Sequence, residues 1–201
     1  MYPETYRNLV TCKDLISFEL AVKETSLYVS ASKNLKSKTL RLVQKYRGHL
    51  ESYIERHPGF RTSLTPLPLT DDAPLIVKAM LEAGEKAGVG PMASVAGAIA
   101  EFVGRELMPF SREVIIENGG DIFLTTSLTR IIGIYAGASP LGGKIGLEIA
   151  PDNTPIGVCT SSGTVGHSLS FGKADAAVLV SPSATLADAA ATAVGNIIRT
   201  N

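Results

Sequence analysis

The chain has 201 residues, of which 45% are hydrophobic, and its 19 basic and 19 acidic side chains leave a formal net charge of zero. This length and apolar content suffice for a substantial core, in one domain or in two small ones. The balanced charge argues against a protein that binds nucleic acid by neutralising its phosphates.

Charge is distributed unevenly along the chain. Residues 1–62 hold 11 Lys and Arg against 6 Asp and Glu, whereas the remainder holds 8 against 13. A basic face near the N-terminus suits an anionic ligand, although the solvated surface of a helix explains the same excess more simply.

The N-terminal sequence MYPETYRNLV lacks the charged start, apolar core and cleavage site of a secretory signal. No apolar stretch approaches the length of a membrane span. Cys12 and Cys159 lie far apart, form no CxxC motif and are interpreted as reduced thiols. We therefore expect a cytoplasmic protein that does not enter a membrane.

The N-terminal part is predicted to form a hairpin followed by a helix. Apolar residues alternate over 16–31, which indicates two strands that turn near Glu24–Ser26. A basic segment over 34–57 then carries apolar residues at helical spacing, and Pro58 and Gly59 end it.

The segment TSLTPLPL, residues 62–69, has two prolines and is expected to be an extended connector. It is the best internal boundary in the sequence. We expect a single domain over 1–201, with the hairpin and basic helix in 1–62 and a nucleotide-binding core in 70–200.

Past the connector, helices are predicted over 70–88, where Thr and Asp residues can cap the start, and over 92–107. An alanine-rich helix over 183–200 comes last. Between them lie five segments with the character of strands: 112–126, 129–137, 144–150, 156–162 and 175–181. Strands in a row flanked by helices indicate an α+β fold rather than a regular parallel βαβ series.

The sequence GVGPMA, residues 88–93, has the letters of a dinucleotide-binding fingerprint but not its context. A helix precedes it instead of a strand, and Pro91 interrupts the loop, so a turn between two helices explains its glycines. The chain contains no Walker A, HExxH or GxSxG motif.

The segment CTSSGTVGHS, residues 159–168, offers Cys159, Ser161, Ser162 and His167 as a nucleophile and a base. A Gly/Ser loop after a strand, with Cys159 as a small core residue, is the simpler interpretation. The exposed N–H groups and hydroxyls of such a loop also suit phosphate oxygens.

Two other groups of residues allow both a binding and a structural interpretation. Asp188 and Thr192 share a helix face and could give two oxygen ligands to a hard cation, but Thr185 and Asp188 also match a TxxD capping box, which the sequence alone favours. The stretch NGGD, ending at Asp121, lies within the predicted strand 112–126. It is consistent with a bulge, or with a ligand that presses against the backbone.

Taken in order, these motifs resemble the ApbE-like flavin transferases, which move FMN from FAD onto a protein threonine. That family has an LGGIAKG helix start, an NxGGD strand, a TSG loop and an ADALATA helix. This chain has MASVAGA over Met92–Ala98, ENGGD over Glu117–Asp121, TSSG over Thr160–Gly163 and ADAAATA over Ala187–Ala193. The likeness covers about residues 70–200, and the whole chain looks like a small cytoplasmic branch of unassigned function.

The resemblance implies that Mg²⁺ is held by the side chains of Asp188 and Thr192 and by the carbonyl group of Ala96. It also implies a nucleotide-binding surface, in which paired glycines let the flavin lie close to the backbone. The residues expected there are Asn118, Gly119, Gly120, Asp121, Ser161, Ser162 and Gly163.

The chain departs from the family at two motifs. The lysine of IAKG is Gly97, and of the family's HHIxDPxTG segment only His167 is kept, which makes it the default catalytic base. Binding elements are thus better retained than reaction elements.

The resemblance implies layered sheets flanked by helices in an ApbE-like, T-fold-related structure. The expected function is binding of FAD, FMN or a related nucleotide, with Mg²⁺. Two alternatives remain open: FAD-dependent flavin transfer to a protein acceptor, and an oligomeric scaffold that has lost the ligand.

Overall fold

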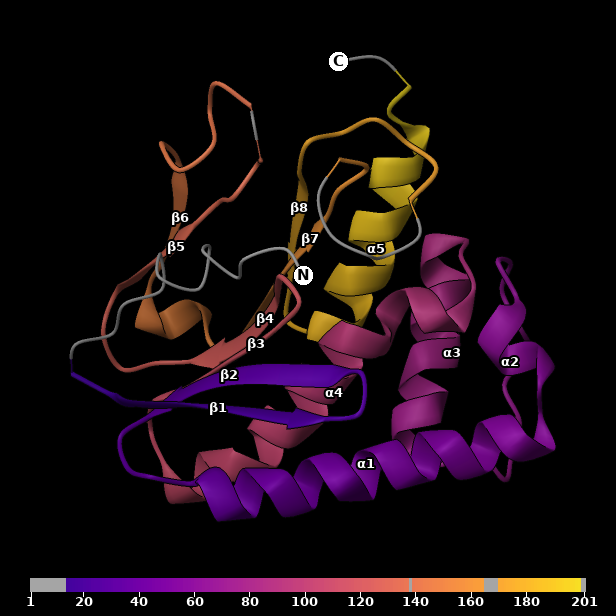
Figure 1. The fold of residues 1–201 in the computed structure, drawn as a ribbon, viewed down its shortest axis with the longest axis horizontal. Coiled ribbons are helices and arrows are strands. Elements are labelled where there is room, and N and C mark those ends of the chain that lie inside the picture. Colours follow the sequence, from indigo (N-terminus) through magenta and orange to yellow (C-terminus); the bar gives the residue numbers. More distant parts are fainter. Residues whose placement is uncertain (1–13, 138, 165–169, 200–201) are drawn as a thin grey trace.

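The computed structural model describes residues 14–137, 139–164 and 170–199. An antiparallel sheet of six strands forms its centre, in the order β1-β2-β3-β4-β7-β8 (Figure 1). Its strands are β1 (Ile16–Val22), β2 (Thr25–Ala31), β3 (Val114–Asn118), β4 (Asp121–Thr125), β7 (Ile156–Ser161) and β8 (Ala177–Ser181). The predicted N-terminal hairpin is β1–β2, and β2 pairs directly with β3.

The helices lie against one face of this sheet. They are α1 (Lys36–Arg56), α2 (Gly59–Thr62), α3 (Leu75–Ala87), α4 (Val95–Leu107) and α5 (Ala184–Ile197), with short 3-10 turns η2 (Pro91–Ser94), η3 (Met108–Phe110) and η4 (Pro151–Asn153). α4 contacts β3 and β4, α5 contacts β7 and β8, and α1 and α3 pack on these two helices (Figure 1). Gly104 lets α4 approach the sheet, because a Cβ there would lie 2.2 Å from the ring of Phe123.

A small two-stranded sheet, β5 (Arg130–Gly133) and β6 (Gly146–Ile149), lies on the other side. Ile132 and Ile149 from this sheet pack with Ile115 and Leu124, which belong to central strands. β3 and most of β4 are therefore buried on both faces, which explains their nearly continuous apolar sequence. The predicted α+β fold is confirmed.

Two local predictions were wrong. The stretch NGGD is not a bulge within one strand: Gly119 and Gly120 form the two-residue loop between β3 and β4, and Asn118 pairs with Asp121. Their φ angles of 66° and 102° fit a type I′ turn, which glycine adopts readily. Helix α3 begins at Leu75 without a side-chain cap, after Pro74, and not at the Thr and Asp residues of 70–72.

Within the described ranges, no single helix is long and apolar enough to cross a membrane. Two helical segments taken together, Leu75–Ala87 and Pro91–Phe110, have the length and composition of a membrane span, but they are bent by 104° relative to each other.

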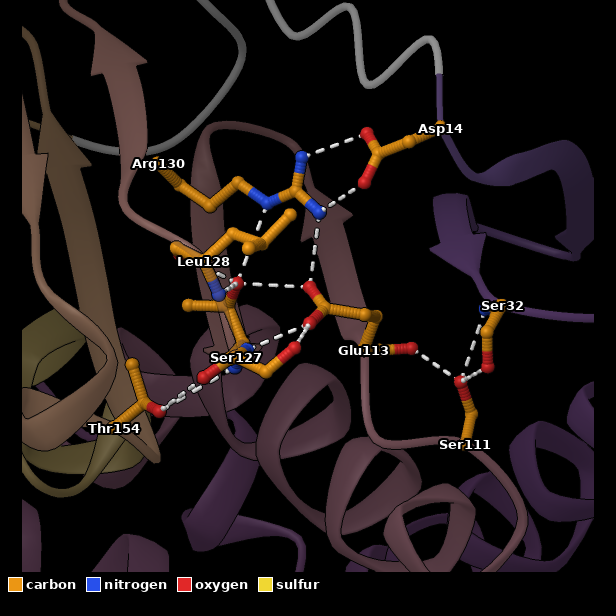
Figure 2. Close-up of polar contacts among 9 residues, drawn as sticks. Asp14, Ser32, Ser111, Glu113, Ser127, Leu128, Arg130 and Thr154 are labelled. Carbon is orange, nitrogen blue, oxygen red and sulfur yellow. Dashed lines mark hydrogen bonds and ion pairs between the residues drawn. The ribbon is translucent and has the colours of Figure 1, made fainter.

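A network of polar contacts connects β5 to the main sheet, as Figure 2 shows. The Glu113 carboxylate accepts hydrogen bonds from Thr126 Oγ1 at 2.8 Å, from the N–H of Ser127 at 2.6 Å and from Arg130 at 2.9 Å. The guanidinium of Arg130 also makes two bonds to Asp14, at 2.8 and 2.7 Å. Burial favours the neutral form of Glu113, but the hydrogen bonds from Ser127 and Arg130 outweigh it and lower the pKa of this carboxyl.

We expect Gly120→Ala to lower the free energy of unfolding by about 1–2 kcal/mol, because an L side chain at positive φ is strained. No atom lies within 4 Å of a Cβ at this position, so crowding makes no contribution. Gly48→Ala is the control, since Gly48 lies inside α1 with the same free space, and there alanine should stabilise by about 0.5–1 kcal/mol. Urea unfolding measures both, and equal changes would contradict the turn assignment.

Glu113→Gln should lower the free energy of unfolding by about 1–3 kcal/mol at neutral pH, because the partly buried Arg130 then loses its buried carboxylate partner and keeps the exposed one, Asp14. The folded-state pKa of Glu113 is below its ordinary value of 4.5, so its carboxylate stabilises the fold above that pH. The difference between variant and wild type should therefore shrink as the pH falls below 4.5. Urea unfolding across this range tests it, and a constant difference would show that the charge is not involved.

Candidate functional site

A cavity of about 310 Å³ lies where η2, α4 and α5 meet the start of β4. The apolar part of its lining includes Val89, Met92 and Val95. The polar side chains that line it are Arg61, Ser63, Asp121, Asp188, Thr192 and Asn196.

Helices α4 and α5 cap each other's first turn beside this cavity. Asp188 of α5 accepts a hydrogen bond from the N–H of Gly97 in α4, at 2.9 Å. In return, Glu101 of α4 accepts hydrogen bonds from the N–H of Thr185 at 3.0 Å and from its hydroxyl at 2.9 Å. Each carboxylate thus accepts a hydrogen bond from an N–H group in the first turn of the neighbouring helix, a group that has no partner within that helix.

The capping-box interpretation of Thr185 and Asp188 was therefore wrong. The N-cap of α5 is Ser183, whose hydroxyl accepts a hydrogen bond from the N–H of Leu186 at 3.2 Å. Thr185 points to Glu101, and Asp188 caps the neighbouring helix instead of its own. Sequence spacing could not reveal this, because the partners lie in different helices.

Gly97 is the point of closest approach between the two helices. A Cβ there would lie 2.4 Å from the carbonyl oxygen of Ala184 and 2.8 Å from the Cβ of Asp188. A lysine at this position, as the resemblance leads one to expect, has no room. The departure from the family motif is thus a packing requirement of this chain.

Asp121 and Asp188 are buried in the same cavity, at 6% and 9% exposure. Burial raises the pKa of Asp188 to about 7, against the hydrogen bonds from Gly97 and Ala96. Burial and then the charge of Asp188 raise the pKa of Asp121 well above its ordinary value, although its Oδ1 accepts from the N–H of Thr160 at 3.3 Å. Two buried carboxylates so placed are costly to ionise together unless a cation lies between or beside them.

The donor set fits a hard cation shared with a ligand. Carboxylate and hydroxyl oxygens of Asp121, Asp188 and Thr192 are the ligand type that Mg²⁺ prefers, and Mg²⁺ usually completes its coordination with phosphate and water. No group of three or more His, Cys, Asp or Glu that could hold a metal occurs in the described part of the chain. The residues therefore suit a jointly held ion rather than an all-protein cage.

The carbonyl group of Ala96, predicted as a metal ligand, already accepts a hydrogen bond. It lines the cavity, but it accepts a hydrogen bond from Asn118 Nδ2 at 3.0 Å. Asn118 thus holds the first turn of α4 to the β3–β4 hairpin, and it does not line the cavity. Among the described residues, Thr192 Oγ1 makes only a long contact of 3.5 Å, to the carbonyl of Ala93, so its lone pairs are available to a cation.

The remaining predicted residues are not brought to the cavity wall. Gly119 and Gly120 serve the turn that places Asp121 at the start of β4, and no ligand-facing role follows from their positive φ. Ser161, Ser162 and Gly163 lie at the end of β7 and just beyond it, where the N–H of Gly163 bonds to the carbonyl of Ala174 at 2.9 Å. His167 lies outside the described residues.

Cys159 is fully buried, and its thiol lies 3.3 Å from the carbonyl oxygen of Ala184. Burial, with the nearby charges of Asp121 and Asp188, raises the pKa of this thiol well above its ordinary value. Its prediction as a core residue is confirmed.

Sequence reasoning missed most residues of the cavity lining, among them Arg61, Phe171 and Asn196. Asn196 could have been predicted from the sequence, because Asp188, Thr192 and Asn196 follow one another at intervals of four on a helix rich in alanine. Phe171 is held next to it, since its N–H bonds to Asn196 Oδ1 at 2.8 Å. Arg61 comes from the N-terminal part, and no sequence pattern links it to this site.

Comparisons with known proteins agree with the resemblance. The family model described as "AbpE bacteria" matches residues 7–201. The UPF0280 protein of Methanococcus aeolicus is 45% identical over 193 residues, which cover 90% of this chain and 75% of that protein. UPF0280 protein MJ1526 of Methanocaldococcus jannaschii is 46% identical over 183 residues, which cover 90% and 74%.

Among solved structures, the apo form of the flavinyl transferase ApbE from Pseudomonas stutzeri matches with a TM-score of 0.57. The match covers 90% of this chain and 83% of that one, and at 13% identity it shows a shared fold. This chain therefore belongs to the ApbE-like family, alongside the UPF0280 proteins.

Proposed function

We propose that this protein binds a flavin nucleotide, FAD or FMN, together with Mg²⁺ in the cavity lined by Asp121 and Asp188. The observation that carries the proposal is the pair of buried carboxylates that line one cavity and whose pKa values are both raised. A divalent cation removes the cost of ionising both groups, and a phosphate then supplies the remaining oxygen ligands.

The shape and lining of the cavity support a nucleotide of this kind. Its volume of about 310 Å³ lies within the range of small-molecule sites, and its polar groups are few and adjoin apolar walls. Val89, Met92 and Phe171 offer apolar contact for an aromatic ring, while the carboxylates and Thr192 would hold the ion that binds the phosphates. A bound Mg²⁺ would supply neutralisation of phosphate charge.

Binding has more support in this chain than transfer. Transfer of FMN to a protein threonine needs a base that takes the hydroxyl proton, and of the family's HHIxDPxTG segment this chain keeps only His167. The fold shared with the Pseudomonas stutzeri flavinyl transferase makes transfer to a protein acceptor the second candidate. The cytoplasmic location expected from the sequence remains part of the proposal.

Asp188→Asn should weaken the contribution of Mg²⁺ to FMN affinity, because the amide oxygen still accepts from Gly97 but carries no charge. In wild type, Mg²⁺ should tighten FMN binding relative to EDTA. In the variant this gain should fall by on the order of tenfold or more. Calorimetric titration in both buffers measures it, with Asp71→Asn, an exposed aspartate outside the cavity, as the control. If the variant loses affinity equally in Mg²⁺ and EDTA, Asp188 acts only as the cap of α4.

Incubation with FAD and Mg²⁺ distinguishes binding from transfer. Moving FMN from FAD onto a hydroxyl leaves AMP, so chromatography of the nucleotides and intact-mass measurement of the protein, alone and with threonine-bearing acceptor proteins, detect the reaction. The binding proposal predicts that FAD is recovered unchanged. Release of AMP, with a protein heavier by one FMN, would establish the transferase instead.

A further inference from the structure

The cavity contains one cationic side chain from the described residues, that of Arg61. It is exposed, and no described residue forms an ion pair or a side-chain hydrogen bond with its guanidinium. Two other arginines of the N-terminal part are engaged: Arg47 pairs with Glu24 and Glu51, and Arg56 pairs with Asp72. Arg61 is therefore free to meet a ligand.

The backbone that carries Arg61 is held firmly in place. Its neighbour Phe60 is 1% exposed and packs edge-on against Tyr53, with ring centroids 5.2 Å apart. On the other side, the N–H of Gly90 bonds to the carbonyl of Leu64 at 3.0 Å. This segment lies so close to the turn before η2 that a Cβ on Gly90 would fall 1.9 Å from the carbonyl oxygen of Ser63.

The charges around the cavity indicate a function for the guanidinium of Arg61. Asp121 and Asp188, when ionised, bring two negative charges, which one divalent cation balances. Arg61 then gives the site a net positive charge, which favours an anionic ligand. A guanidinium also presents paired N–H donors that match phosphate oxygens.

We propose that Arg61, presented by α2 on a fixed backbone, binds the phosphate group of the ligand and selects phosphorylated ligands over neutral ones. This inference rests on the proposed function, and it adds the recognition of phosphate by the N-terminal part of the chain. α2 contacts η2, and η2 contacts α5, the helix that carries Asp188, so the two parts of the site come from distant parts of the sequence (Figure 1).

Equilibrium titrations in Mg²⁺ with three probes test the proposal: FMN, riboflavin, which lacks the phosphate, and inorganic pyrophosphate, which lacks the flavin. They are run on wild type, Arg61→Gln, Arg61→Lys and the control Arg41→Gln. Arg41 is an exposed arginine of α1 outside the cavity, so its substitution changes the net charge equally. Because Arg61 has no described partner, folding should be unaffected, and circular dichroism and thermal unfolding verify it.

Arg61→Gln should weaken FMN and pyrophosphate binding by about tenfold, the loss of one charge-assisted contact of roughly 1.4 kcal/mol. Riboflavin affinity should change by less than about twofold. Arg61→Lys should recover part of the loss, since it keeps the charge without the fork of donors. Arg41→Gln should match wild type for all three probes.

The outcomes separate this inference from the proposed function. If wild type and Arg61→Gln bind FMN equally, or riboflavin weakens as much as FMN, the role of Arg61 is overturned while flavin binding stands. If pyrophosphate binding depends on Arg61 but neither flavin binds, Arg61 is supported and the flavin proposal fails. If wild type binds none of the probes, both are overturned.

Discussion

The first turns of α4 and α5 depend on each other for their hydrogen bonds. Asp188 accepts from Gly97 and Glu101 accepts from Thr185, so neither helix can shift without leaving buried backbone groups unpaired. Burial opposes the charge of Glu101, but the N–H of Thr185 and the guanidinium of Arg105 hold its pKa below the ordinary value. Glycine at position 97 makes this close crossing possible. The cavity exists because the two helix starts are fixed side by side.

This constraint also explains why the site combines distant parts of the chain. The β3–β4 hairpin places Asp121 next to α5, and Asn118 ties the same hairpin to the first turn of α4. The segment after α1 closes another wall through its contact with Gly90. The acidic groups of the cavity therefore come from the C-terminal half and its cation, Arg61, from the N-terminal part, which carries the excess of basic residues.

Local patterns in the sequence predicted the α+β fold well, because strand alternation and helical spacing are short-range signals. They located the N-terminal hairpin, α1 and α5 close to their observed bounds. The adjacent residues Gly119 and Gly120 were placed inside one strand, as a bulge or a ligand contact, although two glycines with positive φ are equally typical of a two-residue hairpin turn. Asp188 was assigned to its own helix, since reciprocal capping depends on which helices pack together. Arg61 could not be found at all, because nothing local relates it to Asp188.

We propose that the crossing of α4 and α5 forms a binding site for a cation and a nucleotide phosphate. Anomalous diffraction from crystals grown with Mn²⁺ in place of Mg²⁺, and with FMN, tests it most directly. We expect an anomalous peak in contact with the Asp188 carboxylate and near Asp121 and Thr192, with the FMN phosphate between the ion and Arg61. FMN bound at another surface, or a cavity without an anomalous peak in which Asp188 contacts only the first turn of α4, would contradict it.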